Sequence, residues 1–88
     1  MRVLLVEDDA RMAESAEKFL RNAGYAVDVA PDGASALHLA SLNPYDAVVL
    51  DLGLPDMDGL EVCRRLRARG EPVRIVMATA RDAVESRI

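Results

Sequence analysis

The sequence predicts a doubly wound α/β domain, in which helices cover both faces of a parallel sheet. Short apolar runs of strand length alternate with segments whose apolar residues recur at three- and four-residue spacing. This alternation is typical of a parallel sheet, because parallel neighbours are joined by crossover connections that are usually helical. The 88-residue length limits the chain to one domain, and a composition of 51% hydrophobic and 30% charged residues is that of a globular protein.

The first half of the chain predicts two strands and two helices. Residues 2–6 form a continuous apolar run, as expected of a strand covered on both faces. A helix follows and ends at Gly24, since glycine best tolerates the left-handed C-terminal cap. Residues 26–30 predict a second strand, and the second helix ends near Pro44. The apolar face of the first helix consists of Met12, Ala13, Ala16, Phe19, Leu20 and Ala23.

The second half repeats the pattern. Residues 47–50 predict a third buried strand, and a loop rich in glycine, proline and aspartate follows at 51–59. Leu60, Cys63 and Leu66 mark a third helix, which Gly70 and Pro72 end. Residues 73–78 predict a fourth strand, and residues 81–88 predict the first turns of a fourth helix.

Composition excludes several classes of protein. The single cysteine, Cys63, rules out an internal disulfide framework and a zinc site built on several thiolates. No apolar run approaches the roughly 20 residues that span a bilayer. A strand-like run directly after Met1 leaves no room for a signal peptide, so we expect a cytoplasmic protein without membrane contact. The net charge of −4 argues against nucleic-acid binding by this segment alone.

Acidic residues gather where the predicted strands end. Glu7, Asp8 and Asp9 follow the first strand, Asp51 follows the third, and Thr79 follows the fourth. In an open parallel sheet, ligands bind beyond the carboxyl ends of the strands, at the point where strand order reverses. The first and third strands flank that point in one common strand order, so we expect their carboxylates to form a site.

Clustered carboxylates need a compensating partner. Two unit charges about 4 Å apart repel by about 4 kcal/mol at an effective dielectric constant of 20. Mg²⁺ would offset this repulsion and would also neutralise an incoming phosphoryl group. A carboxylate in such a site could then act as a nucleophile and form an aspartyl phosphate. The alternative is that these residues cap the following helices, which we favour for Asp9. Composition alone leaves both interpretations open for Glu7, Asp8 and Asp51.

Three segments resemble a known family. They are Val-Glu-Asp-Asp at 6–9, Val-Leu-Asp-Leu-Gly-Leu-Pro-Asp-Met-Asp-Gly at 49–59, and Ala-Thr-Ala-Arg-Asp at 78–82. In order and spacing they are similar to the receiver domain of bacterial two-component response regulators, most of all to the OmpR/PhoB subfamily. The resemblance covers the whole chain and implies a flavodoxin-like fold with strand order 2-1-3-4-5. Residues 1–88 would then be a receiver domain that stops before its fifth strand and fifth helix.

The resemblance also implies a role for each site residue. Asp51 would accept a phosphoryl group from a sensor histidine kinase, and the hydroxyl of Thr79 would donate a hydrogen bond to that group. Glu7, Asp8, Asp51 and the backbone carbonyl of Gly53 would hold Mg²⁺. The domain would promote its own phosphorylation without being a turnover enzyme. It would regulate transcription through a winged-helix DNA-binding domain outside this chain.

Two alternative functions compete with the phosphoacceptor interpretation. The family has a lysine after its fifth strand, whereas the one lysine here, Lys18, lies in the first predicted helix. This departure leaves a binding-only pseudo-receiver open, although the presence of the acidic pair, Asp51 and Thr79 speaks against it. A Mg²⁺-dependent phosphohydrolase of the haloacid-dehalogenase type is the other alternative. Such an enzyme needs a second aspartate two residues after its nucleophile, and Gly53 at that position cannot transfer a proton.

The fourth strand predicts self-association. Without a fifth strand, residues 73–78 would form an apolar edge with unpaired backbone groups, which is a template for pairing with another chain. We therefore expect a homodimer or an edge-paired association.

Three other features are interpreted as structural. His38 is expected on the surface and Cys63 in the core. The third helix carries a cluster of arginines that is expected to be a solvated face: Arg64, Arg65, Arg67 and Arg69.

Overall fold

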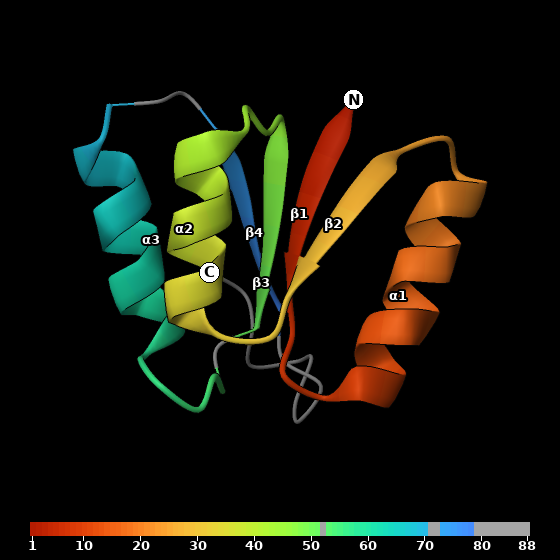
Figure 1. Ribbon diagram of the computed structural model, residues 1–88, viewed down its shortest axis with the longest axis horizontal. Coiled ribbons are helices and arrows are strands. Elements are labelled where there is room, and N and C mark those ends of the chain that lie inside the picture. The colour runs from red at the N-terminus through yellow and green to blue at the C-terminus, as the bar shows by residue number, and fades with distance from the viewer. Residues whose placement is uncertain (52, 71–72, 79–88) are drawn as a thin grey trace.

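The computed structural model describes residues 1–51, 53–70 and 73–78. It consists of a four-stranded parallel sheet with helices on both faces (Figure 1). Strand order is β2-β1-β3-β4, which confirms the predicted doubly wound fold and the first four positions of the expected order. Thr79 and the predicted fourth helix lie outside the described residues. In chain order, the elements are β1 (Arg2–Val6), α1 (Ala10–Asn22), β2 (Ala26–Ala30), α2 (Gly33–Leu42), β3 (Ala47–Asp51), α3 (Gly59–Ala68) and β4 (Arg74–Ala78).

The two faces of the sheet are covered differently. Helix α1 lies over β1 and β2 on one face, whereas α2 and α3 lie side by side on the other (Figure 1). Leu4, Val6, Val48 and Leu50 are almost fully buried under α2 and α3, and they form the main hydrophobic core with Val62 and other residues of those helices. Alternate residues of the strands point to the α1 face, as the period of two in a strand requires.

Each described helix begins after an aspartate that accepts hydrogen bonds from the first turn. Asp9 Oδ1 accepts from the amides of Arg11 and Met12 at 2.9 and 3.2 Å. Asp32 and Asp58 cap α2 and α3 in the same way, with N···O distances of 2.7 and 2.9 Å. These bonds satisfy amides that have no partner inside the helix. The predicted capping role of Asp9 is therefore confirmed.

The apolar face of α1 is less buried than its periodicity indicates. Ala13 is buried, but Met12 and Phe19 are 40% and 73% exposed. The reason is that α1 packs only over β1 and β2, and within the described residues no other helix shares that face of the sheet. Val76 of β4 lies opposite Val49, which lies opposite Leu5, so these three side chains point to the same face of the sheet. Val76 is 53% exposed. An apolar strip thus extends from α1 toward β4.

A polar network joins β1 and β2 to the segment before β3 on the α2 side of the sheet. Asp28 of β2 accepts hydrogen bonds from the Nε of Arg2 at 3.1 Å and from the hydroxyl of Tyr45 at 2.7 Å. The Arg2 guanidinium also lies 5.6 Å from the centroid of the Tyr45 ring. The Tyr45 hydroxyl, followed by Arg2, lowers the pKa of Asp28, while burial and Asp28 raise the pKa of Tyr45 to about 12.

Among the described helices, none has the length and apolar character needed to cross a bilayer.

Candidate functional site

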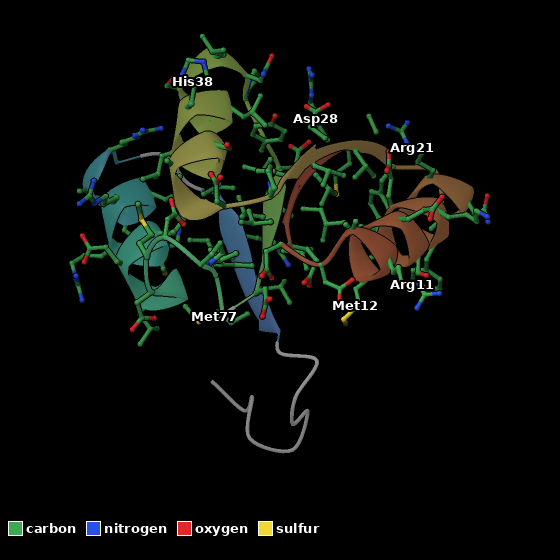
Figure 2. The ribbon with its side chains drawn as sticks, turned by 60° about the horizontal axis from the view of Figure 1, so that its bottom comes forward. Arg11, Met12, Arg21, Asp28, His38 and Met77 are labelled. Carbon is green, nitrogen blue, oxygen red and sulfur yellow. The ribbon has the colours of Figure 1, made fainter. Side chains whose placement is uncertain are left out.

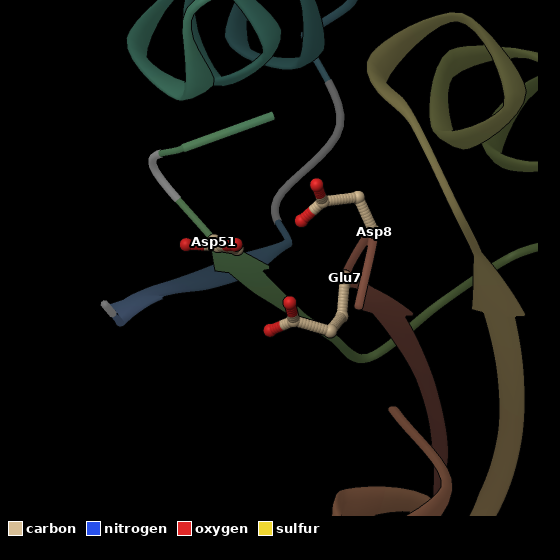
Figure 3. Close-up of side chains that lie close together, drawn as sticks. All are labelled: Glu7, Asp8 and Asp51. Carbon is tan, nitrogen blue, oxygen red and sulfur yellow. The ribbon is translucent and has the colours of Figure 1, made fainter. Parts of the chain in front are cut away.

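The predicted acidic site lies at the carboxyl ends of β1 and β3. These strands are parallel neighbours with Val6 opposite Leu50, so the residues that follow emerge next to each other. Glu7 and Asp8 come directly after β1, and Asp51 is the last residue of β3. One carboxylate oxygen from each of the three residues lies within 4.8 Å of the other two (Figure 3). The structure therefore brings together three of the residues that the sequence analysis assigned to the site.

Backbone contacts fix the position of this cluster. The amide of Glu7 donates to the carbonyl of Ala30 at 3.0 Å, which extends the β1–β2 pairing by one residue. The Glu7 carboxylate accepts from the amide of Asp9 at 3.2 Å, and Asp51 Oδ1 accepts from the amide of Gly53 at 3.2 Å. The cluster thus stands on strand ends and not on a free loop, so its geometry follows from the sheet.

The electrostatics of the cluster are unfavourable when all three groups are charged. Burial raises the pKa of Glu7, and the neighbouring carboxylates of Asp51 and Asp8 raise it further. Glu7 and Asp51 are half-buried, whereas Asp8 is exposed. The site is consequently open to solvent on the Asp8 side and carries repulsion that a cation would relieve.

The residues fit a small hard cation. Octahedral Mg²⁺ has oxygen ligands at about 2.1 Å, which places those oxygens about 3 Å apart at cis positions and about 4 Å apart at trans positions. The observed spacing of up to 4.8 Å is slightly wider, and rotation of the exposed Asp8 side chain or a bridging water would close it. Three carboxylates, open to water and held on strand ends, form a donor set of the type that Mg²⁺ prefers.

Of the two other predicted site residues, Gly53 and Thr79, the structure describes only Gly53. Gly53 is exposed and its amide contacts Asp51, so it lies beside the cluster as expected, although the predicted role belongs to its carbonyl. Thr79 lies outside the described residues.

The loop after Asp51 contains a contact that the sequence analysis did not identify. Asp56 accepts hydrogen bonds from the amides of Gly33 and Ala34, which start helix α2. Asp56 is 23 residues from Gly33 and 22 residues from Ala34 in the chain, and no local sequence pattern links them. Asp56 was part of the motif that carried the family resemblance, but that resemblance gave it no role.

The remaining candidates are structural. His38 is exposed and projects outward from α2 (Figure 2), and Cys63 is half-buried against the core. Arg64 and Arg65 pair with Glu61 on the surface of α3. The last two arginines do more than form the predicted solvated face: Arg67 donates to the carbonyl of Val73 at 2.6 Å, and Arg69 donates to the carbonyl of Leu37 at 3.1 Å.

Comparison with protein families identifies the family of the chain. Residues 3–88 match the family of the response regulator receiver domain. The chain belongs to this family. The resemblance drawn from the three sequence segments is thereby confirmed, and so is the receiver fold.

Individual relatives agree with the family. The chain is 48% identical over all 88 residues to response regulator MprA of Mycobacterium sp. strain KMS, and 46% identical to MprA of Mycobacterium avium strain 104. The chain spans 38% and 39% of the lengths of these two curated relatives.

Solved receiver structures have the same fold. A CheY-like receiver domain from Methylobacillus flagellatus is 36% identical, with a TM-score of 0.86 over 90% of this chain and 69% of that chain. Response regulator TrrA from Thermotoga maritima, solved in complex with Mg²⁺-BeF, is 32% identical. Its TM-score is 0.88 over 99% of this chain and 76% of that chain.

Proposed function

We propose that this receiver domain accepts a phosphoryl group on Asp51 from a sensor histidine kinase, with Mg²⁺ held by Glu7, Asp8 and Asp51. The observation that carries the proposal is the convergence of the three carboxylates within 4.8 Å at adjacent strand ends. Asp51 is the member that ends a central strand and is half-buried, so its carboxylate is oriented by the sheet. The Mg²⁺-BeF complex of the related TrrA supports the choice of metal.

In this proposal Asp51 is the nucleophile. A carboxylate oxygen of Asp51 attacks the phosphorus of a phosphohistidine, so that an O–P bond forms while the N–P bond breaks and its electron pair returns to the imidazole. Glu7 and Asp8 would hold Mg²⁺, Glu7 through a water molecule or directly, and the Gly53 carbonyl would add a ligand. When bound, the metal supplies the positive charge that lets an anionic phosphoryl group approach an anionic site. The hydroxyl of Thr79 would donate a hydrogen bond to the transferred group.

In this proposal the output of the protein would come from a further domain. Residues 1–88 would form the receiver portion, incomplete at its C-terminal end, of a cytoplasmic transcription regulator with a winged-helix DNA-binding domain. The bacterial response regulators named MprA, which are more than twice as long as this chain, support that assignment. The receiver would act stoichiometrically and not as a turnover enzyme.

One experiment separates this function from its alternatives. Residues 1–88, followed by the residues that complete a receiver domain in its relatives, are incubated with Mg²⁺ and a radiolabelled small phosphodonor. We expect one label per chain on Asp51 and none in Asp51→Asn, because the amide has nearly the same shape but is not a nucleophile. Continuous phosphate release would indicate a phosphohydrolase, and no labelling would indicate a pseudo-receiver.

Asp9→Asn is the matched control for this experiment. It removes a carboxylate at the same edge of the sheet, but from a residue that caps α1 and lies outside the cluster. Asparagine is also a good N-terminal cap, so this variant should label like the parent. Equal labelling of Asp51→Asn and the parent would place the acceptor elsewhere.

A further inference from the structure

The geometry points to Asp56 as a positioning residue that ties the loop after the phosphoacceptor to the start of helix α2 and so holds the metal-binding arrangement in place. The inference rests on the proposed function, because it concerns the same site. It adds a residue that does not touch the metal or the phosphoryl group and acts through the loop of residues 53–58. It also links the site to α2, a helix that contributes no residue to the carboxylate cluster.

The contact of Asp56 with α2 uses both carboxylate oxygens. Oδ1 accepts from the amide of Gly33 at 2.8 Å, and Oδ2 accepts from the amide of Ala34 at 2.9 Å. These amides belong to the first turn of α2, where they have no partner within the helix and where an anion is favoured by the helix dipole. A carboxylate held at two points is fixed in orientation as well as in distance. The same two hydrogen bonds lower the pKa of Asp56.

A packing contact from the next residue reinforces this link. Gly33 is buried, and a Cβ atom added to it would lie 2.5 Å from Cγ of Met57. The absence of a side chain at Gly33 therefore makes room for Met57, which packs against the hydrophobic core. Two consecutive loop residues thus meet the same residue of α2, one through a polar contact and one through an apolar contact.

Side-chain hydrogen bonds hold the described part of the loop between Asp51 and α3, residues 53–58, at three places. At its start the amide of Gly53 contacts Asp51, and at its end Asp58 caps α3. Asp56 is the middle attachment, and of these three it is the one whose hydrogen bonds reach an element distant in the chain. Without it, Asp51 would stay in place on β3, and residues 53–55 would keep the Gly53–Asp51 hydrogen bond and the packing of Leu54 against the core but would lose their hydrogen-bonded link to α2. A site that must order its ligands on binding has a lower affinity than one that is preorganised.

Asp32 provides a control that separates positioning from helix stability. It also accepts a hydrogen bond from the first turn of α2, at 2.7 Å from the amide of Ser35. Asp32 lies between β2 and α2, however, and is not part of the loop after Asp51. Loss of either aspartate should weaken the start of α2, whereas only loss of Asp56 should release the loop.

The test compares Mg²⁺ binding and phosphoryl acceptance in four proteins: the parent, Asp56→Ala, Asp56→Asn and Asp32→Ala. Each is used with the residues that complete the receiver domain. Mg²⁺ titrations are followed by amide NMR, which also reports that each variant is folded. We expect Asp56→Ala to weaken Mg²⁺ binding about tenfold and to slow labelling. Asp56→Asn keeps one acceptor oxygen and should recover part of the affinity, and Asp32→Ala should bind Mg²⁺ like the parent.

A second readout does not depend on affinity or on labelling. In the parent, Mg²⁺ should shift the amide resonances of Gly33 and Ala34, and this shift should disappear in Asp56→Ala. Parental affinity and labelling in Asp56→Ala, or equal losses in Asp56→Ala and Asp32→Ala, would overturn the positioning role. If the parent itself neither binds Mg²⁺ nor is labelled, the proposed function fails, and this inference fails with it.

Discussion

Replacing Asp8 by asparagine should make the metal-free protein more stable and remove its stabilisation by Mg²⁺. The substitution neutralises one of three clustered carboxylates and leaves the side chain nearly unchanged in shape. Asp8 is exposed, so the change opens no cavity in the core. Both effects follow from the same charge: without a cation it repels its neighbours, and with a cation it is a ligand.

The magnitude follows from the geometry of the cluster. Carboxylate oxygens 4.8 Å apart repel by about 0.9 kcal/mol in water and by about 3.5 kcal/mol at an effective dielectric constant of 20. Asp8 is solvent-exposed, so the lower figure applies more closely. Neutralising it removes two such pairs, one with Glu7 and one with Asp51, which gives a gain of about 2 kcal/mol. Against a total stability of about 5–15 kcal/mol for a small domain, this gain is measurable.

The assay is urea unfolding monitored by circular dichroism, in chelator and in Mg²⁺ at about one hundred times its dissociation constant. The parent should gain about 2.7 kcal/mol from Mg²⁺ at that concentration, and Asp8→Asn should gain little. Asp9→Asn, with the same charge change one residue away, should keep the parental response because Asp9 is a helix cap. If Asp8→Asn is stabilised by Mg²⁺ as much as the parent, or is less stable than the parent without metal, the assignment of Asp8 is wrong.

Three further outcomes test other parts of the structure. Tyr45→Phe removes the 2.7 Å hydrogen bond to Asp28 and should lower the free energy of unfolding by about 1–2 kcal/mol, measured by urea unfolding; the pKa of Asp28, followed by NMR, should rise. Because the pKa of Tyr45 is raised from 10.0 to about 12, its contribution to stability should be fully present below pH 10 and lost as the pH rises toward 12, a loss that Tyr45→Phe should not show. Val76→Lys places a charge on the exposed apolar residue of β4 and should reduce self-association of the 88-residue chain in light scattering, whereas an unchanged mass would place any association elsewhere.

The sequence was sufficient to predict the parts of the fold that depend on local patterns. Continuous apolar runs identified the two central strands, β1 and β3. Both faces of β1 are covered, whereas the α1 face of β3 is only half-buried because α1 lies over β1 and β2. Asp9 indicated the start of α1, and glycines identified the ends of α1 and α3, where Gly24 and Gly70 have the positive φ angles that glycine tolerates. The carboxylate cluster was predictable for a related reason: parallel strands bring their carboxyl ends to one edge, so residues 7, 8 and 51 must converge once the strand order is known.

The sequence did not predict features that depend on contacts between distant segments. Periodicity assigns Phe19 to an apolar face of α1, but it does not say that α1 lies over β1 and β2 alone and leaves Phe19 exposed. A run of arginines indicates charge, yet it does not say that Arg69 reaches a carbonyl of α2. Asp56 is the same kind of case, since its partners are fixed by the packing of the loop against α2 and by no spacing in the chain.

Aspartates in this protein have two opposite electrostatic settings, and the difference distinguishes site residues from structural ones. Asp9, Asp32 and Asp58 each precede a helix and accept its first amides, so the backbone compensates their charge. Asp8 and Asp51 face each other and Glu7 across two strand ends, where burial and mutual repulsion raise the pKa of Glu7. Residues 8 and 9 are adjacent and are both aspartate, yet their carboxylates have opposite settings. In the proposed function, Mg²⁺ would compensate the charge of these carboxylates after the chain has folded.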